Sequence, residues 1–111
     1  MLENSYVAYL ITKDETGEIK VITAENFKGV IEDCERSIRT SEQDNDILDE
    51  RFEELAEKWY DTEVKTSEKW AEFNTKADEY TKQKNENNEE IRKCENTIKL
   101  IETFAEVNGW V

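Results

Sequence analysis

The sequence predicts a mostly helical α+β fold, in which an N-terminal β-hairpin packs at the base of a long antiparallel helical hairpin, a coiled coil. Two observations predict it. Two short segments near the N-terminus are rich in β-branched and aromatic residues and flank a turn. The rest of the 111-residue chain, which contains no proline, repeats apolar residues at alternating spacings of three and four. A single domain, residues 1–111, is expected for this length.

The β-hairpin is predicted from residues 5–12 and 18–23, whose β-branched and aromatic side chains favour strands. Between them, Asp14, Glu15, Thr16 and Gly17 are typical of a turn, and the glycine can adopt a positive φ. Because an isolated hairpin is marginally stable in water, this one is expected to pack against a helix.

The helical part is predicted to begin with Thr23 as the N-cap. Glu25 places a negative charge in the first turn, and Ile22 and Phe27 stand at the two positions of a hydrophobic staple. At the other end, Gly109 follows Asn108 and is expected to stop the last helix.

Two runs of a/d heptad positions indicate two helices, about residues 24–60 and 68–108, with a turn within 61–69. The runs differ in phase by a four-residue insertion, so one helix with a stutter is the other interpretation of the same pattern. The first run is Phe27, Ile31, Cys34, Ile38, Ser41, Asn45, Leu48, Phe52, Leu55 and Trp59. The second is Trp70, Phe73, Ala77, Tyr80, Lys84, Asn87, Ile91, Cys94, Ile98, Ile101 and Ala105.

Folding the chain back near Thr66 tests the two-helix arrangement. It brings every a position opposite a d position and places Asn45 opposite Asn87, a polar layer of the kind that fixes register. An aromatic tip would then form, which either closes the core or anchors a partner, and it consists of Trp59, Tyr60, Trp70 and Phe73.

Two features favour a different arrangement. Flanking pairs such as Lys58 with Lys76 are like-charged, and two stretches of the chain are rich in cap and turn residues. The alternative is therefore three helices, at about residues 24–40, 46–83 and 88–108. In either arrangement, a second apolar stripe on the last helix is expected to seat the β-hairpin, and it consists of Leu100, Phe104, Val107 and Val111 with Val30 and Trp110.

The charge restricts the partners. With 28 acidic against 15 basic residues, the formal net charge is -13, which opposes direct binding to nucleic acid or to an anionic membrane. A protein with a basic surface is the expected partner. The sequence shows no signal peptide pattern and no apolar run long enough to cross a membrane, so a cytoplasmic protein is expected.

Catalysis is not expected, and neither a cofactor nor a metal site is predicted. The chain has no histidine and shows no phosphate loop or nucleophile motif. Cys34 and Cys94 both occupy d positions in neighbouring layers, where they are expected to be small buried hydrophobic residues rather than a redox pair.

The candidate partner-binding residues form an acidic cluster between residues 42 and 57, in which Arg51 is the one basic residue. The cluster consists of Glu42, Asp44, Asp46, Asp49, Glu50, Glu53, Glu54 and Glu57. Four of these occupy b and f positions and would form an outward ridge, namely Asp46, Glu50, Glu53 and Glu57. Carboxylates at such spacing can imitate nucleic-acid phosphates. The same pattern is also typical of an ordinary solvated coiled-coil face.

In size and charge the chain resembles small phage-encoded inhibitors of host or defence proteins, including anti-CRISPR and DNA-mimic proteins. The resemblance implies an inhibitor acting in the host cytoplasm on a nucleic-acid-binding protein. The second hypothesis is a structural coiled-coil adaptor or self-associating subunit, a homodimer formed through the hairpin edge or the apolar stripe near Phe104.

Overall fold

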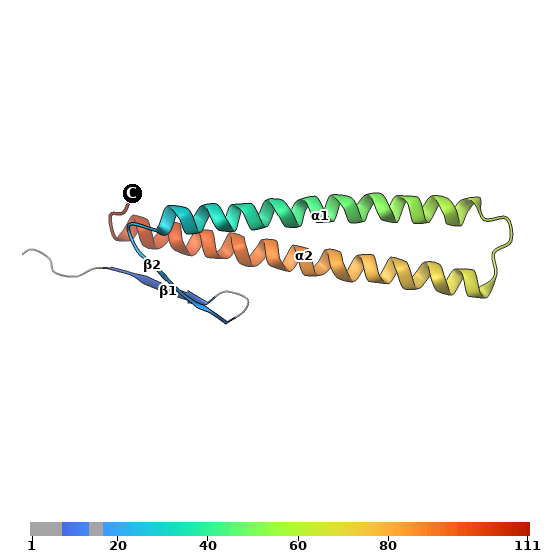
Figure 1. Cartoon of the computed structure of the whole chain (residues 1–111), viewed down its shortest axis with the longest axis horizontal. Helices are drawn as coiled ribbons and strands as arrows, with labels where there is room; N and C mark the ends of the chain where they lie inside the picture. Colours follow the sequence, from blue (N-terminus) through green and yellow to red (C-terminus); the bar gives the residue numbers. More distant parts are fainter. Residues whose placement is uncertain (1–7, 14–16) are drawn as a thin grey trace, which may run out of the picture. The chain divides into compact units, whose positions relative to one another are not determined.

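The computed structural model describes residues 8–13 and 17–111. In chain order the elements are β1 (Leu10–Lys13), β2 (Ile19–Ile22), α1 (Phe27–Asp61) and α2 (Ser67–Val107) (Figure 1). The predicted fold class is confirmed, because a small antiparallel sheet accompanies two long packed helices. The described residues fall into two compact units: unit 1 runs up to Arg36 and resumes at Lys93–Val111, and unit 2 is Ser37–Arg92.

In unit 1, β1 and β2 pair antiparallel, with Leu10 opposite Ile22 at one end of the ladder. Ala8 and Tyr9 belong to no strand, so β1 begins later than the sequence predicted. Directly after β2, the backbone N–H of Thr23 is bonded to the side chain of Asn26 in the helix cap. Predicted strand residues 5–7 and turn residues 14–16 lie outside the described residues.

The start of α1 follows the predicted cap. The hydroxyl oxygen of Thr23 accepts the Glu25 N–H at 3.3 Å, and the Asn26 side-chain oxygen accepts the Thr23 N–H at 2.7 Å. The second bond is the one that an N3 side chain makes in a capping box, here with Asn in place of the usual Glu or Gln, whereas the Thr23 hydroxyl caps the N–H one residue earlier. The Ile22 and Phe27 side chains share one buried cluster, so the predicted hydrophobic staple is also formed.

The end of α2 follows the predicted glycine stop. Gly109 has a φ of 70°, its N–H bonds the Glu106 carbonyl at 3.3 Å, and the Trp110 N–H bonds the Ala105 carbonyl at 2.8 Å. These two bonds define a Schellman motif. The motif turns Trp110 back onto the helices, where its ring lies 5.1 Å from that of Phe104 between centroids.

The core of unit 1 lies between the hairpin and both helices. Its buried residues are Ile22, Phe27, Ile101 and Ala105, and Leu10, Val30, Ile31 and Trp110 pack against them. The hairpin is therefore seated on the a/d seam. The predicted second stripe does not receive it as a whole, since Leu100, Val107 and Val111 remain exposed.

In unit 2, α1 and α2 lie side by side in opposite directions and are joined by a short loop (Figure 1). The loop occupies residues 62–66, within the predicted turn. Thr66 caps α2, because its hydroxyl accepts the Lys69 N–H at 3.2 Å. Both helices are unbroken, so the three-helix alternative is wrong.

The polar stretches that suggested helix breaks instead meet each other in unit 2. The Asn87 side-chain NH₂ donates to the Asn45 oxygen at 3.1 Å, and the Asn45 NH₂ donates to the Asn88 oxygen at 2.9 Å. Because these side-chain amides bond to each other across the helix pair, they do not take hydrogen bonds from the helical backbone, and the helices can continue through both stretches. The predicted Asn45–Asn87 register is confirmed.

Candidate functional site

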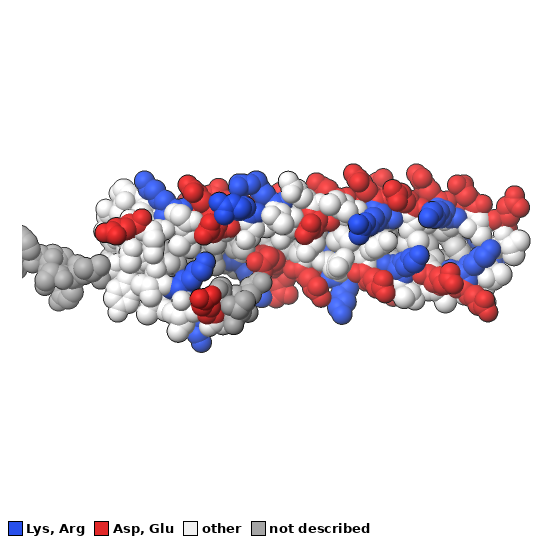
Figure 2. Space-filling model, viewed as in Figure 1, with Lys and Arg blue, Asp and Glu red and all other residues white. Residues whose placement is uncertain are grey.

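The acidic cluster lies on α1 within unit 2. All eight of its side chains are exposed, and Figure 2 shows acidic residues gathered along the outer edge of this part of the helix. On a helix, the Cβ atoms of residues three or four positions apart in the sequence lie about 5–6 Å from each other, and this spacing applies to neighbouring carboxylates of the cluster. The predicted ridge of Asp46, Glu50, Glu53 and Glu57 therefore faces water.

Little in the described part of the chain neutralises this cluster. The Lys84 Nζ lies 2.6 Å from the Asp49 carboxylate, and the other seven carboxylates form no ion pair with a described residue. Arg51, the one base within the cluster, is exposed and forms no ion pair there either. Like charges this close repel one another, and the repulsion would be relieved by a cationic partner.

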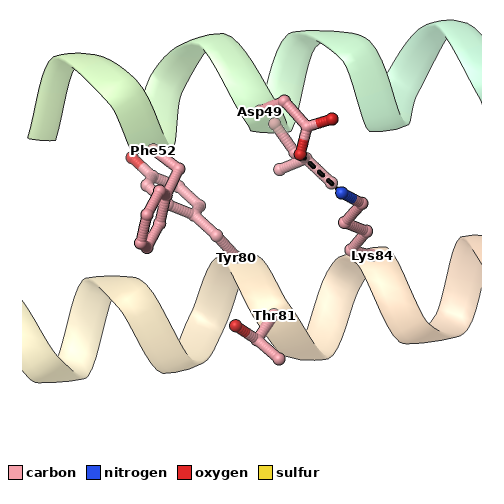
Figure 3. Close-up of a pocket in the computed structure, with 6 residues that line it drawn as sticks. Asp49, Phe52, Tyr80, Thr81 and Lys84 are labelled. Atoms are coloured by element: carbon pink, nitrogen blue, oxygen red, sulfur yellow. Dashed lines mark hydrogen bonds and ion pairs between the residues drawn. The ribbon is translucent and has the colours of Figure 1, made fainter. Parts of the chain in front are cut away.

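A cavity of about 310 Å³ opens beside the cluster, between α1 and α2. Figure 3 shows its labelled walls: Asp49 and Phe52 come from α1, whereas Tyr80, Thr81 and Lys84 come from α2. Leu48 completes the lining. The dashed ion pair between Asp49 and Lys84 spans the two helices at its edge. The acidic surface thus borders an apolar hollow with aromatic walls.

Sequence reasoning did not identify this cavity. It placed Lys84 in the second a/d run, among mostly apolar residues, but assigned it no function. In the structure the side chain of Lys84 lines the cavity with Leu48 while its ammonium group reaches Asp49. A long side chain can bury its stem and keep its charge near water in this way. A lysine at a seam position was therefore the sequence feature that could have indicated this cavity.

The predicted aromatic tip is formed at the loop end of unit 2. The ring of Trp59 lies 5.2 Å from that of Trp70 and 5.4 Å from that of Phe73 between centroids, and Trp70 and Phe73 are 5.8 Å apart. Tyr60 does not join them and is highly exposed. Aromatic rings at these separations pack favourably, so the cluster closes the end of the unit. Trp70 nevertheless remains about half exposed, so one face of the cluster is accessible to a ligand.

The cysteines lie in unit 1 and are both free thiols. Cys94 is buried and Cys34 is half-buried, and a hydrogen bond links their side chains. Burial raises the pKa of the Cys34 thiol above its ordinary value of 9.0, although the positive charge of Lys20 opposes the shift. A raised pKa leaves the thiolate scarce at neutral pH, which makes Cys34 a poor nucleophile.

Among residues 8–13 and 17–111, no group of three or more Cys, Asp or Glu side chains is arranged to hold a metal ion. No helix in this part of the chain combines the length and the apolar character needed to cross a membrane. Comparison of the chain with protein-family models, curated protein sequences and solved structures finds no match.

Proposed function

We propose that the protein is a small acidic interaction module without catalytic activity, which inhibits a basic nucleic-acid-binding protein in the cytoplasm by presenting the acidic cluster to its basic groove. The supporting observation is that seven of the eight exposed carboxylates have no cationic partner among the described residues. Their spacing resembles that of charges along a nucleic-acid backbone. An anti-CRISPR or DNA-mimic protein of a phage would act in this way.

The test compares two charge reversals of equal size. The first variant changes Glu50, Glu53 and Glu57 to Lys, and its control changes three other exposed acids of unit 2, Asp78, Glu79 and Glu86, to Lys. Immobilised wild-type protein and control should capture the same basic protein from a lysate of the natural host, whereas the first variant should not. Mass spectrometry identifies the captured protein.

A second measurement addresses the mechanism. Double-stranded DNA should compete with the module for the captured protein. Binding of the module to that protein should also weaken steeply as the salt concentration rises, because salt screens exposed charges. Retention of the captured protein by the Glu50, Glu53 and Glu57 variant contradicts the proposal. Absence of competition by DNA contradicts the phosphate-imitation part of it.

One observation favours a second candidate, a self-associating structural subunit without inhibitory function. One face of the hairpin carries Tyr9, Ile11, Ile19 and Val21, each 49–59% exposed. Alternation along β1 and β2 places Ile11 opposite Val21 and Ile19 opposite Lys13 on the same face, so Ile11, Ile19 and Val21 form an apolar patch bordered by one lysine. A second copy would cover it in a symmetric dimer, since a two-fold axis pairs the same patch on both subunits.

Sedimentation velocity separates the two candidates. A dimer that Ile11→Thr with Val21→Thr converts to a monomer supports the second, because Thr keeps the strand preference while removing apolar surface. Val64→Thr, at an exposed site in the loop between α1 and α2, is the matched control and should leave the oligomeric state unchanged. A wild-type protein that stays monomeric at all concentrations contradicts the dimer.

A further inference from the structure

A second cavity, of about 240 Å³, lies near the loop end of unit 2 and has the opposite charge character. Lys58 from α1 and Lys69 and Lys76 from α2 line it, against one acidic side chain, Glu72. In a chain with nearly twice as many acids as bases, three lysines converge on this cavity. The composition of the chain would lead one to expect more acidic than basic residues around a cavity, and this cavity has the opposite balance.

The described residues do not neutralise these lysines. The side chains of Lys58 and Lys76 form no ion pair in this part of the chain, and neither does Glu72. The Lys69 ammonium group donates to the Val64 carbonyl at 3.2 Å, which directs it along the loop. Because Lys58 and Lys76 line one cavity and lack an ion-pair partner in this part of the chain, an anion bound there would be attracted by both positive charges.

Aromatic rings form the apolar part of the same cavity. Trp59 and Phe73 are among its lining residues, and their rings lie 5.4 Å apart between centroids. The Lys65 ammonium group lies 5.5 Å from the centroid of the Trp59 ring. A ligand that enters would thus meet ring surface as well as positive charge. Small-molecule sites commonly combine these two features.

We propose that this cavity binds a small aromatic anion, a single ring that bears one carboxylate or phosphate group. The oxyanion would accept hydrogen bonds from Lys58 and Lys76, and the ring would pack on Trp59 and Phe73. The volume lies just below the roughly 300–1,000 Å³ range of sites for drug-sized ligands, so a one-ring ligand is the appropriate size. The site is independent of the acidic cluster and of the function proposed for it.

The experiment titrates the full chain with phenyl phosphate and, separately, with benzoate. The indole N–H signals of the three tryptophans are followed by NMR. Trp59 and Trp70 should shift and saturate, and Trp110, which lies in unit 1, is the internal control and should not move. Inorganic phosphate tests charge alone and benzyl alcohol tests the ring alone, and each should bind at least about tenfold more weakly, a difference of about 1.4 kcal/mol.

Three variants define the site. Lys58→Gln with Lys76→Gln should weaken phenyl phosphate binding about tenfold, whereas Lys82→Gln with Lys99→Gln, an equal change of charge at exposed lysines elsewhere, should not. Glu72→Gln should tighten binding, because it removes the one acid that lines the cavity. Circular dichroism confirms that each variant is folded, which is expected for substitutions of exposed side chains.

Several results would overturn the site. They are the absence of any saturable Trp59 or Trp70 shift with either anion up to about 10 mM, equal weakening by both lysine pairs, and equal binding of benzyl alcohol and phenyl phosphate. Weaker binding to the Glu72→Gln variant would also contradict it. None of these results bears on the acidic cluster, whose function is tested with different residues.

Discussion

Unit 1 and unit 2 use the same two helices but exclude water to different degrees. In unit 1, Ile22, Ile101 and Ala105 are 0% exposed. In unit 2 the most buried apolar side chain, Leu48, is 6% exposed, and Phe52 at a seam position is 41% exposed. The difference follows from the number of layers, because two helices cannot surround a side chain that a third element, here the hairpin, can cover.

Unit 2 is distinguished by a group of polar contacts between its helices. Side-chain bonds join α1 to α2 through Asn45, Asn87 and Asn88, and the Asp49–Lys84 ion pair joins them as well. A polar layer in a coiled coil fixes register at a cost in stability. The comparison indicates that apolar burial stabilises unit 1, whereas polar pairing selects the alignment of the helices in unit 2.

The largest expected effect comes from removing apolar side chains in the two units. Ile101→Ala should lower the free energy of unfolding by about 2–5 kcal/mol, because it leaves a cavity in a closed cluster. Leu48→Ala should cost about 2 kcal/mol, at the lower end of that range, because Leu48 already borders an open cavity that water can enter. Urea unfolding followed by circular dichroism measures both. A Leu48→Ala cost equal to that of Ile101→Ala would refute the difference between the units.

A smaller effect is expected at the Schellman motif of unit 1. Gly109→Ala should destabilise the protein by about 1–2 kcal/mol, since an L-residue is strained at its positive φ. An added Cβ would meet no atom within 4 Å, so backbone strain alone is tested. Gly29→Ala is the matched control in the same unit. Because Gly29 lies inside α1 with equally open space, that change should stabilise by about 0.5–1 kcal/mol.

If Gly109→Ala proves neutral in urea unfolding, the motif does not hold the end of α2. The Trp110 ring, which packs on Phe27 at 5.3 Å between centroids, would then be positioned by other contacts. Equal signs for the two glycine variants would lead to the same conclusion.

The smallest expected effect concerns the asparagine layer of unit 2. Asn45→Leu combined with Asn87→Leu should raise the free energy of unfolding by about 1 kcal/mol, because apolar replacement of a polar pair at half-buried seam positions adds apolar burial. The helices should at the same time lose their single alignment, which sedimentation velocity detects as oligomers and NMR as duplicated signals. Asn85→Leu, at an exposed position of α2, is the control for added apolar surface.

One sharp set of signals in the double variant, together with a lower stability, would show that the layer contributes stability rather than register. That result would contradict the conclusion that polar pairing selects the alignment of the helices in unit 2.

Much of the fold was predictable because its signals are local. Thr23 and Gly109 mark helix ends through bonds to residues at most five positions away, and the hydrophobic staple acts over a similar distance. The pairing of Asn45 with Asn87 is not local, but the heptad period reduced the choice to a single register. The continuity of α1 and α2 was harder to predict. Residues that favour caps and turns can either end a helix or lie within it, and which occurs depends on the hydrogen-bond partners of their side chains.

The candidate site was predicted in part. The exposed ridge of Asp46, Glu50, Glu53 and Glu57 followed from heptad positions alone. The two cavities did not, because each is formed by side chains of both helices whose individual rotamers no periodicity specifies. The like-charged pair Lys58 and Lys76 was visible in the sequence only as a feature that disfavoured the predicted register.

The sequence by itself determined the element order, the helix ends, the helical register and the outward direction of the acidic ridge, since each depends on short-range bonding or on a fixed helical period. The tertiary structure decided that Ile22 is buried against Ile101 and Ala105, that Leu100, Val107 and Val111 stay exposed, and that Lys84 pairs with Asp49. These outcomes depend on which side chains fill the space between separate elements, and packing in three dimensions rather than chain order sets that competition.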